Sequence, residues 1–255
     1  MTDKGLLLII DAQYDFCDEK GSLYVPGAGE DMERLASFIK SNGKKIKDIV
    51  LSQDTHQVID ISHPAFWTNK NGENPAPFTH ITVENVENDE WTPLFGKESG
   101  LKYLKELEKQ GEFPHVIWFE HCIEGSKGAA IVDVVMEAVK DWARFYNKYF
   151  IVIQKGKNPF TEHFGIMQAS VPLDYDADTN LNVPLLNSFA GYDTIYIAGE
   201  AQSHCVASTV KQLLDFPDIA DKIIILKNCM SPVAGFEHLA DDIYRKLKPG
   251  QFVEV

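Results

Sequence analysis

Short apolar runs alternate with longer amphipathic stretches along most of this chain. The clearest runs are continuous and rich in β-branched residues, which is typical of strands buried on both faces of a sheet. They lie at 6–10, 49–51, 150–153, 195–198 and 223–226. Segment 116–119 is a weaker candidate for a short extended stretch.

Between these runs, apolar residues recur at the i, i+3, i+4, i+7 spacing of an amphipathic helix. The pattern predicts helices around 32–39, 131–138 and 236–243. A shorter apolar face, formed by Val206, Val210, Leu213 and Leu214, begins directly after Cys205.

The alternation of strands with helices predicts βαβ units and therefore a parallel sheet covered on both faces. Right-handed crossovers then favour an α/β fold, a three-layer α/β/α sandwich with a doubly wound, mainly parallel sheet. We interpret residues 1–255 as a single domain with a loop-rich insertion at about 64–114. Within the insertion, 98–110 has a helical pattern, and the length of the remaining loop indicates a partial lid.

Charge and cysteine content narrow the class of protein. Lys and Arg total 24 and Asp and Glu total 38, which gives a net charge of −14 and argues against nucleic acid or an anionic membrane as a partner. The four cysteines are widely spaced, unlike those of a disulfide-stapled secreted domain. We therefore expect a reduced, cytoplasmic protein that acts on a small molecule, and a homo-oligomer is compatible with this sequence.

One carboxylate and two imidazoles form a candidate metal site. Asp54 and His56 follow a predicted strand two positions apart, so both side chains point the same way, and His121 would be the third ligand. Such a set suits zinc, manganese or iron and leaves positions for water or substrate. His63 is a further candidate, directly or through water. The alternative is that these are ordinary polar loop residues.

Cys205 is the candidate nucleophile, because it lies between a buried strand and a helix. A thiol at a helix N-terminus loses its proton more easily. Asp11 could accept that proton, and Lys155 could lower the pKa of the thiol and keep the acid ionised. Taken alone, Cys205 could equally be a small core residue. However, Asp11, Lys155 and Cys205 all lie at the ends of predicted parallel strands, which favours a catalytic role.

Several segments together resemble the isochorismatase-like cysteine hydrolases, whose best-known members are nicotinamidases. Segment 9–16, I-I-D-A-Q-Y-D-F, is similar to the family's opening I-x-D-x-Q-x-D-F, and 21–27, G-S-L-Y-V-P-G, to its G-S-L-x-V-x-G. Further matches are S-Q-D-T-H at 52–56, W-F-E-H-C-I-E-G-S-K-G-A at 118–129, K-G at 155–156 and H-C-V at 204–206. They span nearly the whole chain outside 64–114.

The resemblance implies an amidohydrolase with the catalytic triad Asp11, Lys155 and Cys205. In the family the cysteine attacks an amide carbonyl, the aspartate passes the proton to the departing ammonia, and water hydrolyses the thioester. The oxyanion hole would be the backbone N–H groups of Ala201 and Cys205, shaped by a cis peptide between Glu200 and Ala201.

The same resemblance assigns Asp54, His56 and His121 to a divalent metal, with zinc expected ahead of manganese or iron. In nicotinamidases this metal binds the pyridine nitrogen and orients the ring. Phe16 and Trp118 correspond to the aromatic walls of the substrate pocket, and His204 lies beside the nucleophile at that pocket.

This sequence departs from the family on the substrate side. Gln202-Ser203 replaces the usual Thr-Asp, Phe119-Glu120 lacks the usual proline, and 157–163 differs from the Tyr- and Ser-rich stretch of many nicotinamidases. Nicotinamide is the leading candidate substrate, and these departures leave other substrates open. The alternatives are the same chemistry on a carbamoyl, ureido or other amide, or a catalytically silent scaffold.

Overall fold

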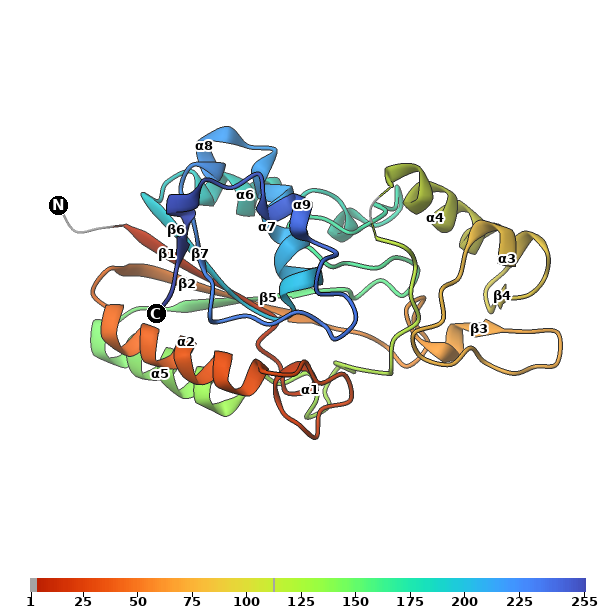
Figure 1. Ribbon diagram of the computed structural model, residues 1–255, viewed down its shortest axis with the longest axis horizontal. Helices are drawn as coiled ribbons and strands as arrows, with labels where there is room; N and C mark the ends of the chain where they lie inside the picture. The colour runs from red at the N-terminus through yellow and green to blue at the C-terminus, as the bar shows by residue number, and fades with distance from the viewer. Residues whose placement is uncertain (1–3, 112) are drawn as a thin grey trace.

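A six-stranded parallel sheet forms the centre of the computed structural model, which describes residues 4–111 and 113–255 (Figure 1). Its strand order is β5-β2-β1-β6-β7-β8, and every pairing in it is parallel. The strands are β1 (Gly5–Ile10), β2 (Ile46–Asp54), β5 (Phe150–Lys155), β6 (Thr194–Gly199), β7 (Ile223–Leu226) and β8 (Phe252–Val253). The predicted fold class is confirmed.

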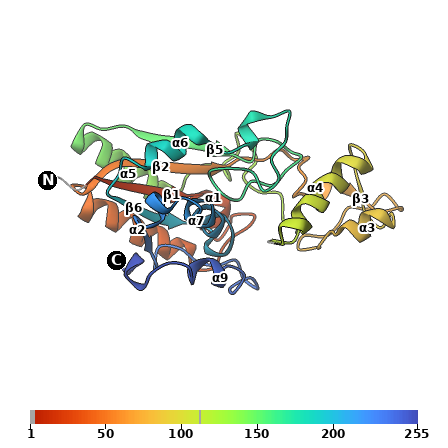
Figure 2. The ribbon, with the colours of Figure 1, turned by 90° about the horizontal axis from the view of Figure 1, so that it is seen from above.

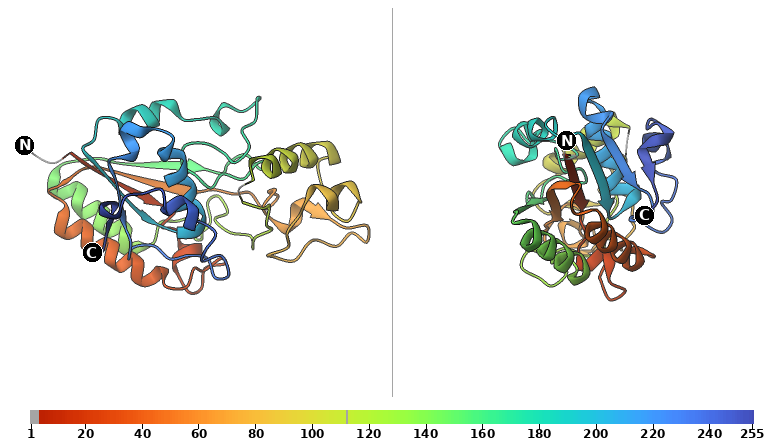
Figure 3. Two further views of the ribbon diagram at one scale, coloured as in Figure 1. Left: turned by 45° about the horizontal axis from the view of Figure 1, so that its top comes forward. Right: turned by 90° about the vertical axis from the view of Figure 1, so that its left-hand side faces the viewer.

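Helices cover both faces of this sheet. α2 (Ala28–Asn42) and α5 (Asp133–Tyr146) lie side by side on one face (Figure 3). The other face carries α6 (Val183–Phe189), α7 (Ala207–Leu214), α8 (Pro217–Ala220) and α9 (Asp241–Tyr244). The short α1 (Tyr14–Cys17) follows β1, and short 3₁₀ turns occur at Pro64–Phe66, Ala177–Thr179 and Pro249–Gln251. Among residues 4–111 and 113–255, no helix combines the length and apolar character needed to cross a membrane.

The two faces of β1 belong to two different hydrophobic clusters. Leu7 and Ile9 pack with α2 and α5, whereas Leu6, Leu8 and Ile10 pack with the helices of the opposite layer. All of β1 is buried because the strand lies between β2 and β6 in the sheet. An apolar run without alternation is the pattern that such a central strand requires.

Three elements differ from the sequence prediction. β5 is an edge strand, so Ile151 and Val152 are 55% and 39% exposed rather than buried on both faces. The helix predicted at 236–243 is mostly turns followed by the four-residue α9, and Phe236 packs on Trp118 and His204. Segment 116–119 forms no strand, only an isolated bridge between Val116 and His80.

The insertion forms a lobe that projects beyond the carboxyl ends of the strands (Figure 2). It contains β3 (Trp67–Thr68), α3 (Val83–Glu87), β4 (Thr92–Pro93) and α4 (Lys97–Gln110). α4 confirms the helical pattern at 98–110, and most of the remainder lies outside regular elements, as expected. Apolar side chains from these elements share one cluster, whose members include Phe66, Trp67, Ile81, Val86, Tyr103, Leu104 and Leu107. The single-domain assignment and the lid function stay predictions.

A buried histidine packs against this lobe, and we expect it to make the stability of the folded chain depend on pH. His115 Nε2 lies 3.0 Å from the carbonyl oxygen of Ile61, and the ring contacts Trp67 and Tyr103. Burial lowers the pKa of His115 to about 4, whereas a histidine in the unfolded chain titrates near about 6.5. As the pH falls between these values the unfolded state takes up the proton first, so the folded state loses stability.

We expect His115→Gln to reduce this acid sensitivity. The glutamine amide can still donate to Ile61 but carries no group that titrates in this range. The wild-type chain should lose up to about 3 kcal/mol of unfolding free energy from His115 between pH 7 and pH 4, and the variant should lose correspondingly less. Denaturant unfolding at both pH values measures the difference. The exposed His238→Gln is the control, and equal slopes for all three proteins would contradict the assignment.

Candidate active site

Parallel strands deliver the candidate catalytic side chains to one edge of the sheet. Asp11 follows β1, Asp54 ends β2, Lys155 ends β5, and the turn that carries Cys205 follows β6. Asp54 and Lys155 are direct partners in the β2–β5 register. The order of the strands changes direction at β1, and ligands of such sheets bind beyond the carboxyl ends at this point.

The ammonium group of Lys155 lies at the centre of the site. Its Nζ is 2.8 Å from Asp11 Oδ2, 3.0 Å from Asp54 Oδ1 and 3.7 Å from Cys205 Sγ. It also donates to the carbonyl oxygen of His163 over 2.9 Å. Lys155 and Asp11 are 2% and 0% exposed, so the ion pair is screened from water. The structure thus brings together Asp11, Lys155 and Cys205 as the sequence predicts.

Burial and charge act in opposite directions on these groups. Burial opposes the charge of Lys155, but the nearby Asp11 and Asp54 raise the pKa of the amine well above its usual range. Burial raises the pKa of Asp11, and Lys155 partly opposes that shift. Asp11 is therefore a carboxylate with an increased tendency to accept a proton.

Lys155 lowers the pKa of the Cys205 thiol, as expected, but the expectation of a net lowered thiol pKa was wrong. Burial raises the pKa of this thiol well above its ordinary value, and Asp11 and Asp54 add to that increase while Lys155 opposes it. One ammonium does not offset two carboxylates and the loss of water. The resting sulfur is consequently a neutral thiol, and it needs a base to become a nucleophile.

Ser52 is a site residue that the sequence analysis missed. Its Oγ donates to Asp11 Oδ1 over 2.6 Å and accepts from the Asp11 backbone N–H over 3.0 Å. Asp11 has a φ of 43°, in the left-handed region that non-glycine residues seldom occupy. A signal for Ser52 was present, since Ser52 and Asp54 lie two positions apart on β2 and so face the same side.

The nucleophile is held in a tight turn between β6 and α7. Gln202–Val206 forms one π-helical turn that contains Cys205, and the helix α7 continues from it. The peptide bond between Glu200 and Ala201 is cis, as the family resemblance implies. Ala201 and Cys205 both line the same small pocket, where their backbone would meet a substrate carbonyl.

The pocket above Cys205 is narrow and lined mainly by aromatic and apolar side chains. The lining comprises Phe16, Leu23, Asp54, Trp118, His121, Glu162, Phe164, Ala201, His204, Cys205 and Val233. Phe16, Trp118 and His204 were expected there, whereas Leu23, Glu162, Phe164 and Val233 were not. The cavity holds about 30 Å³, whereas one water molecule needs about 10–15 Å³ on the same measure. An aromatic substrate therefore requires side chains at the mouth to move.

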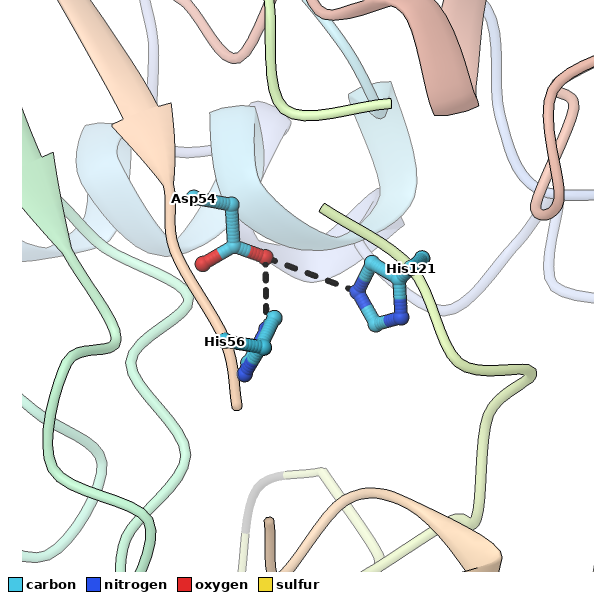
Figure 4. A group of neighbouring side chains, drawn as sticks. All are labelled: Asp54, His56 and His121. Atoms are coloured by element: carbon cyan, nitrogen blue, oxygen red, sulfur yellow. Dashed lines mark hydrogen bonds and ion pairs between the residues drawn. The ribbon is translucent and has the colours of Figure 1, made fainter. Parts of the chain in front are cut away.

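Asp54, His56 and His121 converge on one point beside this pocket (Figure 4). Asp54 Oδ2 lies 3.0 Å from His56 Nε2 and 3.6 Å from His121 Nε2. The outer nitrogens are held in turn, since His56 Nδ1 is 3.0 Å from Asp60 Oδ2 and His121 Nδ1 is 2.8 Å from the carbonyl oxygen of Phe119. Partners of this kind orient histidine ligands in metal sites. The donor set therefore fits a divalent metal.

Two further arrangements are less suited to a metal ion. His63 Nε2 lies 3.3 Å from His121 Nδ1, and His63 is not among the three side chains whose donor atoms meet. Asp11, Asp54 and Cys205 form a second cluster of donor atoms within 4.8 Å of one another. The ammonium group of Lys155 already supplies the positive charge for that cluster.

Three residues of the segment that follows β1 each have their own partner in the site. Gln13 uses its carboxamide to clamp Asp54, donating to the Asp54 carbonyl and accepting from the Asp54 N–H, both over 2.7 Å. Asp15 accepts from the backbone N–H of Cys122 over 2.7 Å and so fixes the loop that carries His121. Phe16 then contacts the His121 ring. This one segment therefore positions two of the candidate metal ligands.

Comparisons with known proteins agree with this geometry. No family model matches the chain. A nicotinamidase from Saccharomyces cerevisiae is 22% identical over 242 residues, which cover 95% of this chain and 94% of that protein. The structure of a yeast nicotinamidase matches with a TM-score of 0.66 at 18% identity, covering 98% of this chain and 99% of that one. The chain has the nicotinamidase fold.

Two other solved structures extend the comparison beyond yeast. An Acinetobacter baumanii nicotinamidase and pyrazinamidase matches with a TM-score of 0.63 at 18% identity, covering 99% of this chain and 96% of that one. A Pyrococcus horikoshii pyrazinamidase in complex with zinc matches with a TM-score of 0.55 at 16% identity, covering 99% and 98% of the two chains. The resemblance to isochorismatase-like hydrolases, and to nicotinamidases among them, is confirmed at the level of the fold.

Removing Lys155 from this nicotinamidase-like site should destabilise the whole chain. Lys155→Met leaves Asp11 and Asp54 buried without their counter-charge, and we expect a loss of about 3–5 kcal/mol of unfolding free energy. Denaturant unfolding measures this loss of free energy, after dialysis of both proteins against a chelator to remove any bound metal. Lys105→Met is the matched control, because Lys105 pairs with Glu87 at the surface over 2.8 Å and its loss should barely change stability. Equal effects of the two substitutions would contradict a central role for the Lys155 ion pairs.

Proposed function

We propose that this chain hydrolyses the C–N bond of a small aromatic carboxamide, with nicotinamide as the first candidate, and releases ammonia. The observation that carries the proposal is the convergence of Asp11, Lys155 and Cys205 on a pocket that also presents the Asp54, His56 and His121 donors. The nicotinamidases and pyrazinamidases of similar fold support the same chemistry.

The reaction begins with a proton transfer from sulfur to carboxylate. Asp11 accepts the proton of the neutral Cys205 thiol, and the resulting thiolate attacks the carbonyl carbon of the amide. The backbone N–H groups of Ala201 and Cys205 stabilise the oxyanion that develops. Lys155 stays charged throughout and limits the cost of placing negative charge on sulfur in a site without water.

Collapse of this tetrahedral species breaks the C–N bond. Asp11 returns its proton to the departing nitrogen, so that neutral ammonia leaves and a thioester to Cys205 remains. Asp11 next accepts a proton from an incoming water, whose oxygen attacks the thioester carbonyl. The carboxylic acid leaves and the proton on Asp11 returns to sulfur, which restores the starting enzyme.

The metal-ligand group has a positioning role in this proposal. Asp54, His56 and His121 would hold a divalent ion, with zinc as the first candidate, as in the zinc-bound pyrazinamidase of similar fold. A bound ion would supply a Lewis-acid contact for a ring nitrogen of the substrate. Phe16 and Trp118 would pack on the faces of the ring and direct the carboxamide toward Cys205.

Replacing the nucleophile tests the reaction directly. We expect Cys205→Ala to lower kcat for ammonia release from nicotinamide by at least about 10³-fold, because no other group can form the thioester. A coupled ammonia assay measures it. Cys229→Ala, which removes a buried thiol outside the pocket, should keep most of the activity. Full turnover by the Cys205 variant would rule out the mechanism.

A substrate panel separates the alternatives. Nicotinamide, pyrazinamide, benzamide and a ureido compound should be compared by kcat/KM for ammonia release. Preference for the two carboxamides with ring nitrogens supports the proposal. Preference for the ureido compound would assign the same cysteine chemistry to another substrate, and no turnover of any of them would favour a silent scaffold.

Loss of the metal should impair substrate positioning more than chemistry at sulfur. We expect His56→Ala, or chelation of the wild-type chain, to lower bound metal by about tenfold or more and to raise KM for nicotinamide more than it lowers kcat. Elemental analysis of the purified protein and steady-state kinetics measure the two effects. The exposed His80→Ala serves as the control. A chain that contains no stoichiometric metal as purified would contradict this assignment.

A further inference from the structure

Glu200 is a completely buried acid directly beside the oxyanion turn, and nothing in the proposed mechanism uses it. It is 0% exposed and immediately precedes Ala201. Its Oε2 accepts a hydrogen bond from the backbone N–H of Ser231 over 3.1 Å. Its Oε1 is buried as well and receives no hydrogen bond within the described part of the chain. An ionised carboxylate would be costly in such a place.

Asp31, from α2, binds the same serine as Glu200, so the two carboxyl groups are neighbours. Asp31 accepts from the hydroxyl of Ser231 over 2.5 Å and pairs with the Arg34 guanidinium over 2.6 Å. Two neighbouring buried carboxyl groups cannot both ionise easily, so the acid that has the weaker partners keeps the proton. Asp31 has a cation and a hydroxyl donor, whereas Glu200 has one amide donor.

The surroundings of Glu200 favour its neutral form on balance. The charged and titratable groups there are Asp31, Arg34, the buried thiols of Cys17 and Cys229, and the hydroxyl of Tyr244. Burial raises the pKa of Glu200 well above its ordinary range, Asp31 raises it further, and Arg34 opposes the shift. A protonated Glu200 also accounts for its unpartnered oxygen, since a hydroxyl there could donate to Asp31.

These contacts tie the nucleophile turn to the segment 228–233. Ser231 donates two hydrogen bonds, from its backbone N–H to Glu200 and from its hydroxyl to Asp31. The carbonyl oxygen of Ser231 in turn accepts from the N–H of Gln202 over 2.9 Å. Two residues further on, the N–H of Val233 donates to Ser203 Oγ over 3.0 Å. Any shift of Ser231 would therefore move the turn that carries Ala201 and Cys205.

We propose that Glu200, in its neutral acid form, is a positioning residue that locks the oxyanion turn onto Ser231 and Asp31. The acid hydroxyl donates to Asp31, and the other oxygen accepts from the Ser231 amide. Its effect reaches the substrate only through the backbone of the turn. This inference rests on the proposed amide hydrolysis for its kinetic consequence but not for its protonation or its contacts.

Two substitutions of similar size separate hydrogen bonding from packing. Glu200→Gln keeps an acceptor for Ser231 and a neutral donor for Asp31, whereas Glu200→Met keeps the volume and loses both bonds. We expect the Gln variant to stay within about threefold of the wild-type kcat, and the Met variant to fall by about 10- to 100-fold with little change in KM, as for a misplaced reacting group. A Met variant with wild-type kcat, or a Gln variant that falls as far as the Met variant, would overturn the proposal.

Two measurements test the same inference without any turnover. Infrared difference spectra between the wild type and Glu200→Gln at neutral pH should contain the carbonyl band of one protonated carboxylic acid. The exposed Glu237→Gln should lack this band. Amide hydrogen exchange in segment 228–233 should accelerate in Glu200→Met and stay close to wild type in Glu200→Gln.

These readouts keep the two proposals apart. If the wild-type chain hydrolyses no carboxamide, the proposed function fails, and the spectra and the exchange rates still decide the state of Glu200. If the Met variant does not fold, the acid band and the exchange rates of the Gln variant decide. An absent acid band, or faster exchange of segment 228–233 in the Gln variant, would overturn the proposal whatever the enzyme turns over.

Discussion

A single buried ammonium group determines how this active site is assembled. Lys155 faces two carboxylates that come from two other strands, and none of the three is open to water. A buried charge is tolerated only when it is well paired, so the chain must bring the ends of β1, β2 and β5 together before any of these charges is stable. The parallel register between Asp54 and Lys155 achieves this for one pair. The same ion pairs that make the site chemically competent therefore also depend on correct folding of the sheet.

Asp54 connects the two halves of the site. Its Oδ1 contacts the Lys155 ammonium, while its Oδ2 faces His56 and His121. One carboxylate thus pairs with the ammonium group beside Cys205 and also contributes to the candidate metal position. Gln13 fixes the backbone of Asp54 through its N–H and carbonyl, while the contacts with Lys155, His56 and His121 hold the two side-chain oxygens.

Features that depend on local sequence patterns could be predicted from the sequence, whereas features that depend on distant residues could not. β1, β6 and β7 were visible because central strands need uninterrupted apolar residues, and the site residues were found because parallel strands end at one edge. The exposure of β5 depends on its place in the strand order, which no local pattern encodes. The 236–243 segment has helical spacing, yet Phe236 packs on Trp118 and His204, which are far away in sequence and which no local pattern reveals. The thiol pKa could not be judged from neighbours in sequence, because burial by residues far along the chain dominates it.

Closure of the pocket and the state of the sulfur are two consequences of the same packing. His204 contacts Trp118, Phe164 and Phe236, which come from three separate segments and together fill the space above Cys205. This packing removes water from the thiol and so keeps it protonated in the resting chain. A substrate that displaces these rings would bring its own carbonyl and the oxyanion turn into contact with the sulfur. In the proposed mechanism, proton transfer to Asp11 would become favourable only once an acceptor for the negative charge is in place, so the thiol would stay unreactive without substrate.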